Sequence, residues 1–516
     1  MPRRERNVTT RTGLALALLV AILVPLGPAV TGSTAAGAAP LPPPAPGSVL
    51  VPCGQAGVRG NVTVDSHLDP TCTYTAGFDV TASDVTLDCQ GATIAGPTDG
   101  PFGQGVTVRA PVTVALHGVR VRNCHISGFG NSLRVTRTGF KDLAAGVEYD
   151  NAFSDIVVED SEMTGSRGVG IYVDGYVTGV TIQRTNIHGA GSSGVYLETG
   201  SKDNVVRDND IVGNGFKENG AQGTKTVFNG LTVRYWGPGR EGISVDSSRF
   251  NHITGNRITG NSAGGIFLYK NCGEYYITHA GSWMERRYGA NGNLIEGNTI
   301  SNGLHGVWVG ARMGENTYPM ECSSPAYSEG PLERYVLDEA TDNVVRGNTF
   351  SDVTYGVHVE DDRTTVEGNT FAGPDAGFWA VIIGTRMRTP VLGLPVRGTV
   401  LQGNSSTIVG NASPYRWVHG QVDTTVEANT ALGRVVGICE VPELPHNPMV
   451  MVIALAVEDP NGPPTPAPDL TVKTLGAQAA CADVTAATST TTTTAAPVAA
   501  APGTTSAGSI TPVFTG

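Results

Sequence analysis

The residues from 204 to 374 repeat one short pattern five times: NVVRDNDIVGNG (204–215), NHITGNRITGN (251–261), NLIEGNTISNG (293–303), NVVRGNTFSDV (343–353) and TTVEGNTFAGP (364–374). In each copy, a short run of alternating apolar and polar residues precedes a Gly-Asn or Asp-Asn turn, and a second such run follows it. Alternation with a period of two is typical of a half-buried β-strand. The copies therefore predict many short strands in a repeating order.

A third predicted strand, which begins with Gly, follows most copies and also occurs earlier in the chain: GVEYD (146–150), GIYVD (170–174), GVYLE (194–198), GISVD (242–246), GIFLY (265–269), GVWVG (306–310) and GVHVE (356–360). Where no loop intervenes, these strands are about 21–25 residues apart. Three short strands and three turns of this total length make one coil of a solenoid, and one coil must stack on others to bury its apolar side chains. We predict an all-β chain, a right-handed parallel β-helix with about 22 residues per coil, over residues 51–456 with an N-terminal cap and a C-terminal extension.

The Asn residues at the turns have a predicted structural role. We expect each to adopt the left-handed conformation and to stack on its neighbours as an internal amide ladder. The predicted ladder comprises Asn209, Asn256, Asn298, Asn348, Asn369, Asn404 and Asn429.

The composition supports strands and excludes some functions. The 516 residues include 68 Gly and 32 Pro, and only 16% are charged, which argues against a helical bundle. The formal net charge of −12 argues against a broad surface for nucleic acid.

The two ends of the chain differ from its middle. Residues 1–39 resemble a cleaved signal peptide, since basic residues precede an apolar run that is too short to cross a bilayer. A Pro-rich linker follows at 40–50, and residues 457–516 form a Pro/Thr/Ala-rich tail that we expect to be disordered. No later segment is predicted to span a membrane. These features predict a secreted, extracellular protein.

The eight cysteines fit an oxidising compartment. Their even number and the absence of Cys-x-x-Cys spacing favour disulfides over metal ligation. Two long insertions, after GIFLYKN and after GVWVGAR, each contain one cysteine. We therefore predict a disulfide between Cys272 and Cys322.

The repeats resemble those of NosD-type (PbH1-repeat) proteins and of the pectate lyase, polygalacturonase and mannuronan epimerase folds, over roughly residues 80–435. The resemblance implies the fold, but this architecture also hosts phage spikes and adhesins, so it does not by itself imply an activity. The epimerases have an Asp-Pro-His-Glu or Asp-Pro-His-Asp run on such a strand. Here GISVDSSRFN (242–251) places Ser244, Val245, Asp246 and Ser247 at those positions, so the epimerase activity is not implied.

Side-chain alternation on the third strands predicts two outward columns. One contains Glu148, Tyr172, Tyr196, Ser244, Phe267, Trp308 and His358, and the other contains Asp150, Asp174, Glu198, Asp246, Tyr269, Gly310 and Glu360. An aromatic column beside an acidic column suits sugars, because aromatic faces stack on pyranose rings and carboxylates accept hydrogen bonds from hydroxyls. An ordinary solvated sheet face is the alternative.

The insertions strengthen the sugar-binding interpretation. The two long loops leave successive coils at one corner, and a third insertion, TVRYWGPGREG, begins at Thr232. Loops of this length are uncommon unless they bind or cover a ligand. We expect them to form the walls of a groove over the coils from Gly242 to Asp362. The predicted substrate-binding residues are Tyr196, Trp236, Arg240, Phe267, Tyr269, Tyr275, Trp283, Arg286, Trp308 and His358.

Two kinds of chemistry fit this groove, and the sequence leaves both open. A lyase acting on a polysaccharide that contains uronic acids needs a cation at the C6 carboxylate and a base for the C5 proton. Lys270, Arg286, Arg287 and Arg312 are candidate cations, and His279, His305, Tyr269 and Tyr275 are candidate bases. A glycoside hydrolase needs paired carboxylates, here Asp246 with Glu360 or Glu274.

These alternatives define the predicted catalytic set as Asp246, Lys270, His279, Arg312 and Glu360. No cofactor is required, although the run Glu360, Asp361 and Asp362 is a possible calcium site. The preferred function is a secreted polysaccharide lyase or else a glycoside hydrolase. The alternative is a non-catalytic carbohydrate-binding or cell-surface β-helix.

Overall fold

The computed structural model describes residues 41–55, 57–97, 103–216, 224–228, 231–236, 238–270, 286–314, 326–373, 379–385, 387–408, 413–441 and 454–457. The predicted signal peptide, the predicted C-terminal tail and the Cys272–Cys322 disulfide lie outside these residues.

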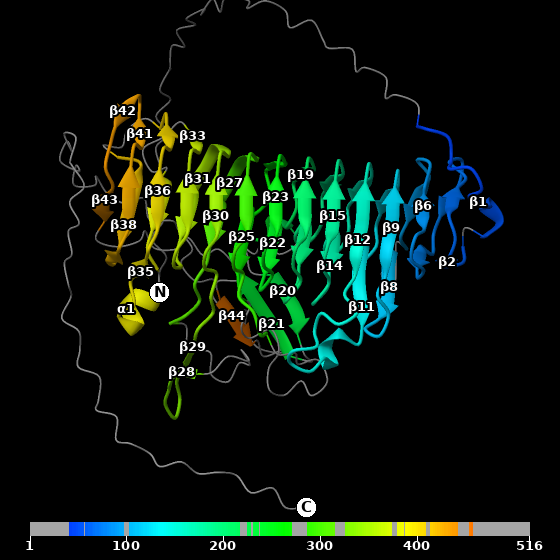
Figure 1. The fold of residues 1–516 in the computed structure, drawn as a ribbon, viewed down its shortest axis with the longest axis horizontal. Coiled ribbons are helices and arrows are strands. Elements are labelled where there is room, and N and C mark those ends of the chain that lie inside the picture. Colours follow the sequence, from blue (N-terminus) through cyan, green and yellow to red (C-terminus); the bar gives the residue numbers. More distant parts are fainter. Residues whose placement is uncertain are drawn as a thin grey trace, which may run out of the picture. The chain divides into compact units, whose positions relative to one another are not determined.

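Three parallel sheet faces run along the stacked coils, and each coil contributes one strand to each face. Figure 1 shows the coils side by side in sequence order, from β1 and β2 to β38 and β43. Strands from successive coils pair in parallel and in register, as in β18, β23 and β26, where Val206, Ile253 and Ile295 are partners. This arrangement is a parallel β-helix.

Face A contains the strands that precede the Asn turns. They are β1 (Val49–Val51), β3 (Ser66–Leu68), β6 (Thr86–Asp88), β9 (His117–Arg122), β12 (Ser154–Glu159), β15 (Val180–Gln183), β18 (Val205–Arg207), β23 (His252–Thr254), β26 (Leu294–Glu296), β30 (Val344–Arg346), β32 (Thr365–Glu367), β36 (Val400–Gln402) and β40 (Thr425–Glu427).

Face B contains the strands that follow those turns. They are β4 (Thr73–Tyr74), β7 (Thr93–Ala95), β10 (His125–Ser127), β13 (Glu162–Thr164), β16 (Asn186–His188), β19 (Asp210–Val212), β24 (Arg257–Thr259), the first residues of β27 (Thr299–Val309) and β31 (Thr349–Val359), β33 (Thr370–Ala372), β37 (Ser405–Ser406) and β41 (Thr430–Ala431).

Face C contains the third strands. They are β2 (Gly60–Val62), β5 (Phe78–Val80), β8 (Gln104–Pro111), β11 (Asn131–Thr138), β14 (Ile171–Val173), β17 (Val195–Leu197), β22 (Glu241–Asp246), β25 (Gly264–Tyr269), the last residues of β27 and β31, β34 (Trp379–Ile383), β38 (Tyr415–Val418) and β43 (Cys439–Val441).

Shorter elements lie outside the three faces or at their ends. They are β28 (Ala326–Glu329) with β29 (Arg334–Val336), β35 (Val396–Arg397) with β39 (Gln421–Val422), β42 (Arg434–Val435), the helix α1 (Arg388–Leu392) and two 3-10 turns, Cys53–Gln55 and Phe140–Asp142.

An inserted hairpin forms its own small sheet with a distant segment. The strands β20 (Thr224–Phe228) and β21 (Leu231–Trp236) pair in antiparallel fashion between β19 and β22 in the chain. The strand β44 (Ala454–Val457) pairs with β21, as Figure 1 shows. A segment near the C-terminal end of the sequence is therefore hydrogen-bonded to an insertion in its middle.

One earlier copy of the third strand was predicted wrongly. Residues Gly146–Asp150 (GVEYD) form turns, and β11 occupies the corresponding place on face C. Arg134 of β11 is therefore the strand partner of Tyr172, and it takes the position that was predicted for Glu148. The local pattern of GVEYD matches a strand, but the preceding strand already completes that coil.

The core of the solenoid consists of the inward residues of all three faces. The predicted inward residues of the third strands are fully buried in one cluster, and they are Ile171, Val195, Ile243, Ile266, Val307 and Val357. Each buried aliphatic side chain contributes about 1.5–3 kcal/mol relative to exposure. This confirms the predicted alternation on these strands.

The amide ladder is confirmed, with one correction to its backbone conformation. Asn209, Asn256, Asn298, Asn348, Asn369, Asn404 and Asn429 are buried and joined by Nδ2–Oδ1 hydrogen bonds of 2.9–3.0 Å. The residue before each Asn has the positive φ, for example Gly255 at 65° and Gly297 at 62°. The residue before the Asn, most often a glycine, therefore makes the turn, and the Asn side chain points inward.

Two further Asn ladders were not predicted. Asn204, Asn251, Asn293 and Asn343 form one at the start of the face A strands, with Nδ2–Oδ1 distances of 2.8–3.0 Å. Asn214 and Asn261 form a shorter one, at 2.9 Å, at the end of face B. The first residue of four quoted repeats supplied the signal for the longer ladder.

Gly306 lies where two coils approach too closely for a side chain. A Cβ at this position would lie 2.5 Å from the backbone oxygen of Gly356 and 2.5 Å from the ring of Phe350. We expect Gly306→Ala to lower the free energy of unfolding by about 1–3 kcal/mol, because the added methyl group overpacks the stack. Denaturant titration followed by circular dichroism measures this change.

Gly330→Ala is the matched control, since no heavy atom lies within 4 Å of a Cβ at Gly330. We expect this variant to unfold at nearly the wild-type denaturant concentration. Equal shifts for the two variants would contradict the steric explanation.

Candidate functional site

Face C presents the predicted outward columns, but the described side chains do not line an open groove. Tyr172, Tyr196, Ser244, Phe267, Trp308 and His358 are successive partners, as the alternation predicts. However, Ser244, Phe267, Trp308 and His358 are at most 1% exposed. The expectation of a solvent-open groove is therefore wrong for these residues. Phe267, Tyr269, Trp308 and Ala263 instead form a separate apolar cluster outside the core.

The second outward column contains a buried ionic cluster centred on Asp246. Arg286 Nη1 lies 3.0 Å from Asp246 Oδ2 and 3.0 Å from Glu198 Oε1. Tyr196 donates a hydrogen bond of 2.7 Å to Asp246 Oδ2, and Ser247 donates one of 2.9 Å to Oδ1. We call Asp246, Glu198, Arg286 and Tyr196 the Asp246 cluster. Because one nitrogen contacts both acids, the two carboxylate oxygens are within about 6 Å of each other.

The Asp246 cluster continues toward the N-terminal coils. The rings of Tyr172 and Tyr196 stack at 5.1 Å, and Tyr172 donates a short hydrogen bond to Glu198. Arg134 forms a two-pronged ion pair with Asp174, at 2.8 and 3.0 Å, and its guanidinium lies 5.5 Å from the centre of the Tyr172 ring. Acids, phenols and guanidinium groups thus alternate along three coils.

Glu241 forms a second polar cluster beside the first, and it was not among the predicted site residues. Its side chain is fully buried, and Oε1 accepts hydrogen bonds from Ser244 and from Tyr269, the latter at 3.1 Å. Arg240 lies 3.3 Å from the same oxygen and donates a hydrogen bond of 2.8 Å to Tyr269. The adjacent Arg-Glu pair in the third insertion was the signal for this site.

Two candidate proton carriers have shifted pKa values. Burial raises the pKa of the Tyr269 hydroxyl well above its usual value, which makes that group a poor base. Burial lowers the pKa of Lys270, and the nearby Asp338, Glu339 and Asp246 oppose this shift. Lys270 is therefore the better proton acceptor of the two.

Glu360 lies in a third group on face C. It accepts a hydrogen bond of 2.8 Å from Trp308 Nε1 and lies 3.6 Å from His358 Nε2. The His305 ring stacks on Tyr355 at 4.8 Å nearby. Glu198 shares Arg286 as a partner with Asp246, and the pairing of Asp246 with Glu360 or Glu274 stays a prediction.

The other predicted residues have varied positions. The backbone N–H of Arg312 donates a hydrogen bond of 2.5 Å to Asp338. Arg287, a candidate cation, forms an ion pair of 2.8 Å with Glu148. His279, Tyr275, Trp283, Cys272, Cys322 and Glu274 lie outside the described residues, as does the side chain of Trp236.

The acidic run after β31 is divided between two sets of partners. Arg388 forms ion pairs of 2.6 Å with Asp361 and 2.6 Å with Asp362, whereas Glu360 contacts Trp308. The backbone N–H of Ala340 also donates a hydrogen bond of 2.6 Å to Asp361. Asp361 and Asp362 therefore share Arg388, whereas Glu360 faces Trp308.

Asp361 gives the stability of the protein a specific pH dependence. Burial raises the pKa of its carboxyl from 3.8 to about 6, although Arg388 and two backbone N–H groups oppose the shift. The folded state then binds a proton more tightly than the unfolded state, so raising the pH from about 4 to 6 removes that proton and lowers the free energy of unfolding. We expect wild type to lose roughly 1–3 kcal/mol relative to Asp361→Asn over this range, by denaturant titration. Parallel pH profiles for the two proteins would contradict this prediction.

Five of the described cysteines are disulfide-bonded, and four of them lie near the N-terminal end of the solenoid. Cys53 pairs with Cys72, Cys89 pairs with Cys124, and Cys439 is also disulfide-bonded. Within the described ranges, one group of potential metal ligands comes together, Cys53, Asp69 and Cys72, and the disulfide occupies both of its sulfurs. The described helices include none that is long and apolar enough to cross a bilayer.

A family model described as "Right handed beta helix region" matches residues 112–282. The chain is a right-handed parallel β-helix protein. This confirms the predicted fold and the resemblance of the repeats to those of β-helix proteins. No curated protein matches the sequence of this β-helix.

Several solved β-helix structures are similar to this one. The A-module of the mannuronan C-5 epimerase AlgE6 from Azotobacter vinelandii is 13% identical, with a TM-score of 0.42 over 73% of this chain and 90% of that chain. The Dettilon tailspike protein is 13% identical, with a TM-score of 0.41, and the match spans 73% of this chain and 62% of the tailspike. An alginate lyase from Paenibacillus sp. is 13% identical, with a TM-score of 0.35 over 75% of this chain and 98% of that chain. Likenesses of this degree concern the fold alone.

Proposed function

We propose that this β-helix acts on a polysaccharide, with its chemistry at the Asp246 cluster on face C. The observation that carries the proposal is the pair of carboxylates, Asp246 and Glu198, held by one guanidinium among stacked phenols. Replacing such buried ion pairs by apolar side chains is often neutral or stabilising, so they are weak evidence for a stabilising role. Groups of this kind are candidates for function.

The geometry favours hydrolysis of a glycosidic bond over β-elimination. A lyase needs a cation that is available for the uronate carboxylate, but Arg134, Arg240 and Arg286 each already lie against a protein carboxylate. A glycoside hydrolase needs two nearby carboxylates, and retaining enzymes place them about 5–5.5 Å apart. The oxygens of Asp246 and Glu198 that contact Arg286 lie within about 6 Å of each other, which is compatible with that distance. Lyase chemistry, with Lys270 as the base, is the second candidate within this class.

Arg286 lies over the two carboxylates, so a sugar reaches them only when this side chain is displaced. Arg286 directly follows the insertion after β25, at the corner where the loops leave the coils.

The burial of face C supports a second candidate function, a non-catalytic carbohydrate-binding or cell-surface β-helix. Asp246, Tyr269 and Trp308 are at most 1% exposed, and a structural role needs no access to them. Enzyme and binder differ in whether product forms.

The deciding experiment incubates the full-length protein with a panel of neutral and uronic-acid polysaccharides. New reducing ends without ultraviolet absorbance of an unsaturated sugar indicate hydrolysis, and reducing ends with that absorbance indicate a lyase. Affinity for a polysaccharide without either product supports the binding alternative. Failure to bind or cleave any member would overturn the proposal.

A further inference from the structure

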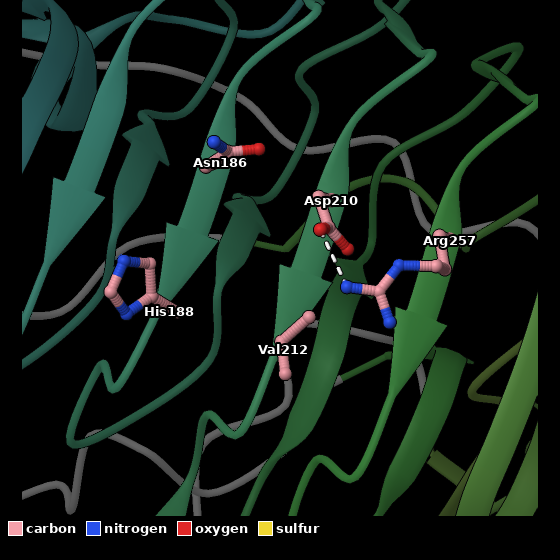
Figure 2. A pocket seen from close by; sticks show the side chains of 5 residues that line it. All are labelled: Asn186, His188, Asp210, Val212 and Arg257. Carbon is pink, nitrogen blue, oxygen red and sulfur yellow. Dashed lines mark hydrogen bonds and ion pairs between the residues drawn. The ribbon is translucent and has the colours of Figure 1, made fainter. Parts of the chain in front are cut away.

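A depression of about 320 Å³ lies on face B, away from the Asp246 cluster on face C. Figure 2 shows its lining residues, which come from three successive coils. Asn186 and His188 belong to β16, Asp210 and Val212 to β19, and Arg257 to β24. Its volume is at the lower end of the range for small-molecule sites.

The strand register explains why the surface is hollow at this point. Asn186, Asp210 and Arg257 are partners in one outward column of face B, and His188 and Val212 are partners in the next. Asp210 and Val212 of β19 are shorter than Arg257 of β24 and His188 of β16, which lie on either side of β19. Val212 forms an apolar part of the floor, and polar groups surround it (Figure 2).

Two walls of the depression are held in place by polar contacts, one outside the depression and one within it. His188 Nε2 lies 3.0 Å from Glu162 Oε1 and 3.1 Å from Thr164 Oγ1, which fixes the imidazole ring. Arg257 Nη2 donates a hydrogen bond of 2.5 Å to Asp210 Oδ2, drawn as a dashed line in Figure 2. Prearranged walls reduce the entropy lost when a ligand binds.

Two other polar groups at the depression, an amide and one carboxylate oxygen, lack a hydrogen-bond partner within the described residues. The side-chain amide of Asn186 makes no hydrogen bond to another residue that the structure describes, and Asn186 is exposed. Asp210 Oδ1 also accepts no hydrogen bond within the described chain, but this oxygen is buried. An amide offers two donors and an acceptor, and a carboxylate oxygen accepts from a hydroxyl.

We propose that this depression binds one pyranose unit of a neutral saccharide. A pyranose has an apolar C–H face that fits Val212 and the fixed imidazole of His188, and a rim of hydroxyls that fits the side-chain amide of Asn186 and the guanidinium of Arg257. Asp210 already neutralises Arg257, and Glu162 adds a negative charge beside His188. The charge balance thus disfavours an anionic sugar. This site goes beyond the proposed function, since it needs no chemistry at Asp246.

Isothermal titration calorimetry on the full-length protein tests the proposal. The probes are three neutral tetrasaccharides, of β-linked glucose, mannose and xylose, and the tetrasaccharide of galacturonic acid. We expect millimolar binding of at least one neutral probe and weaker binding of the anionic one. Val212→Trp fills the depression and Asn186→Ala removes its free amide, so each should weaken binding at least tenfold.

Thr349→Ala is the matched control, because Thr349 is exposed on the same face in β31, outside the depression. It should bind as wild type does. Asp246→Asn should also keep this binding, which separates the result from the proposed function. The inference is overturned if no neutral probe binds, if the anionic probe binds more tightly, or if Asp246→Asn abolishes binding while Val212→Trp leaves it intact.

Discussion

Replacing Asp246 by Asn should reduce turnover of the polysaccharide identified in the panel by about 10²–10⁴-fold, the range expected for loss of a positioned acid or base. The substitution keeps the size of the side chain but removes the charge that Arg286 and Tyr196 contact. Initial rates over a range of substrate concentrations measure the effect. The loss should appear in kcat, because the carboxylate acts on the reacting bond.

Glu329→Gln controls for the loss of a carboxylate, since Glu329 is exposed on β28. It should retain wild-type turnover. Both variants should have the circular dichroism spectrum of wild type, because Asn keeps the size of Asp246 and Glu329 is exposed. Unchanged turnover in folded Asp246→Asn would refute the assignment of the chemistry to this cluster.

Replacing Asn298 by Leu should cost roughly 3–6 kcal/mol of unfolding free energy, because two or three buried polar groups lose their partners at about 1–3 kcal/mol each. Asn298 Oδ1 accepts from the backbone N–H and the side chain of Asn256, at 3.0 and 2.9 Å. Its Nδ2 donates to Asn348 Oδ1 at 3.0 Å and to the carbonyl of Ile253 at 2.9 Å. Leu fills the space but supplies none of these bonds.

The position within the ladder should grade the effect. Asn429 is the last member of the ladder, so Asn429→Leu leaves fewer groups unpaired than Asn298→Leu. Asn61→Ala, at an exposed Asn bonded to Thr81, should change the unfolding free energy by less than about 0.5 kcal/mol. Denaturant midpoints for the three variants decide the order. Equal costs would show that the ladder is not a cooperative support.

The periodic features of the fold were predictable because each depends on local spacing. The period-two alternation of GIFLY places Ile266 inward and Phe267 outward, and the structure confirms both. The Asn ladder was predictable since one residue type recurs at one turn. The prediction of a third strand at GVEYD was wrong because a short pattern does not reveal whether the preceding strand already completes the coil.

The burial of face C was not predictable, because it depends on contacts between residues far apart in sequence. Arg286 and Glu198 are 88 positions apart, and no repeat relates them. The sequence supplied Asp246 and Arg286 as candidates, but their shared partner Glu198 and the Glu241 cluster follow only from three-dimensional packing. Alternation tells which side of a sheet a residue faces, and it says nothing about what covers that side.

The pairing of β44 with β21 has a consequence for biosynthesis. Coils can form one after another as the nascent chain emerges, since each needs only its neighbour. The hairpin β20–β21 must wait until residues 454–457 have left the ribosome, because they supply its third strand. A ribosome that stops earlier would release a stack of coils whose inserted hairpin has an unpaired edge, a ready target for proteases and for self-association.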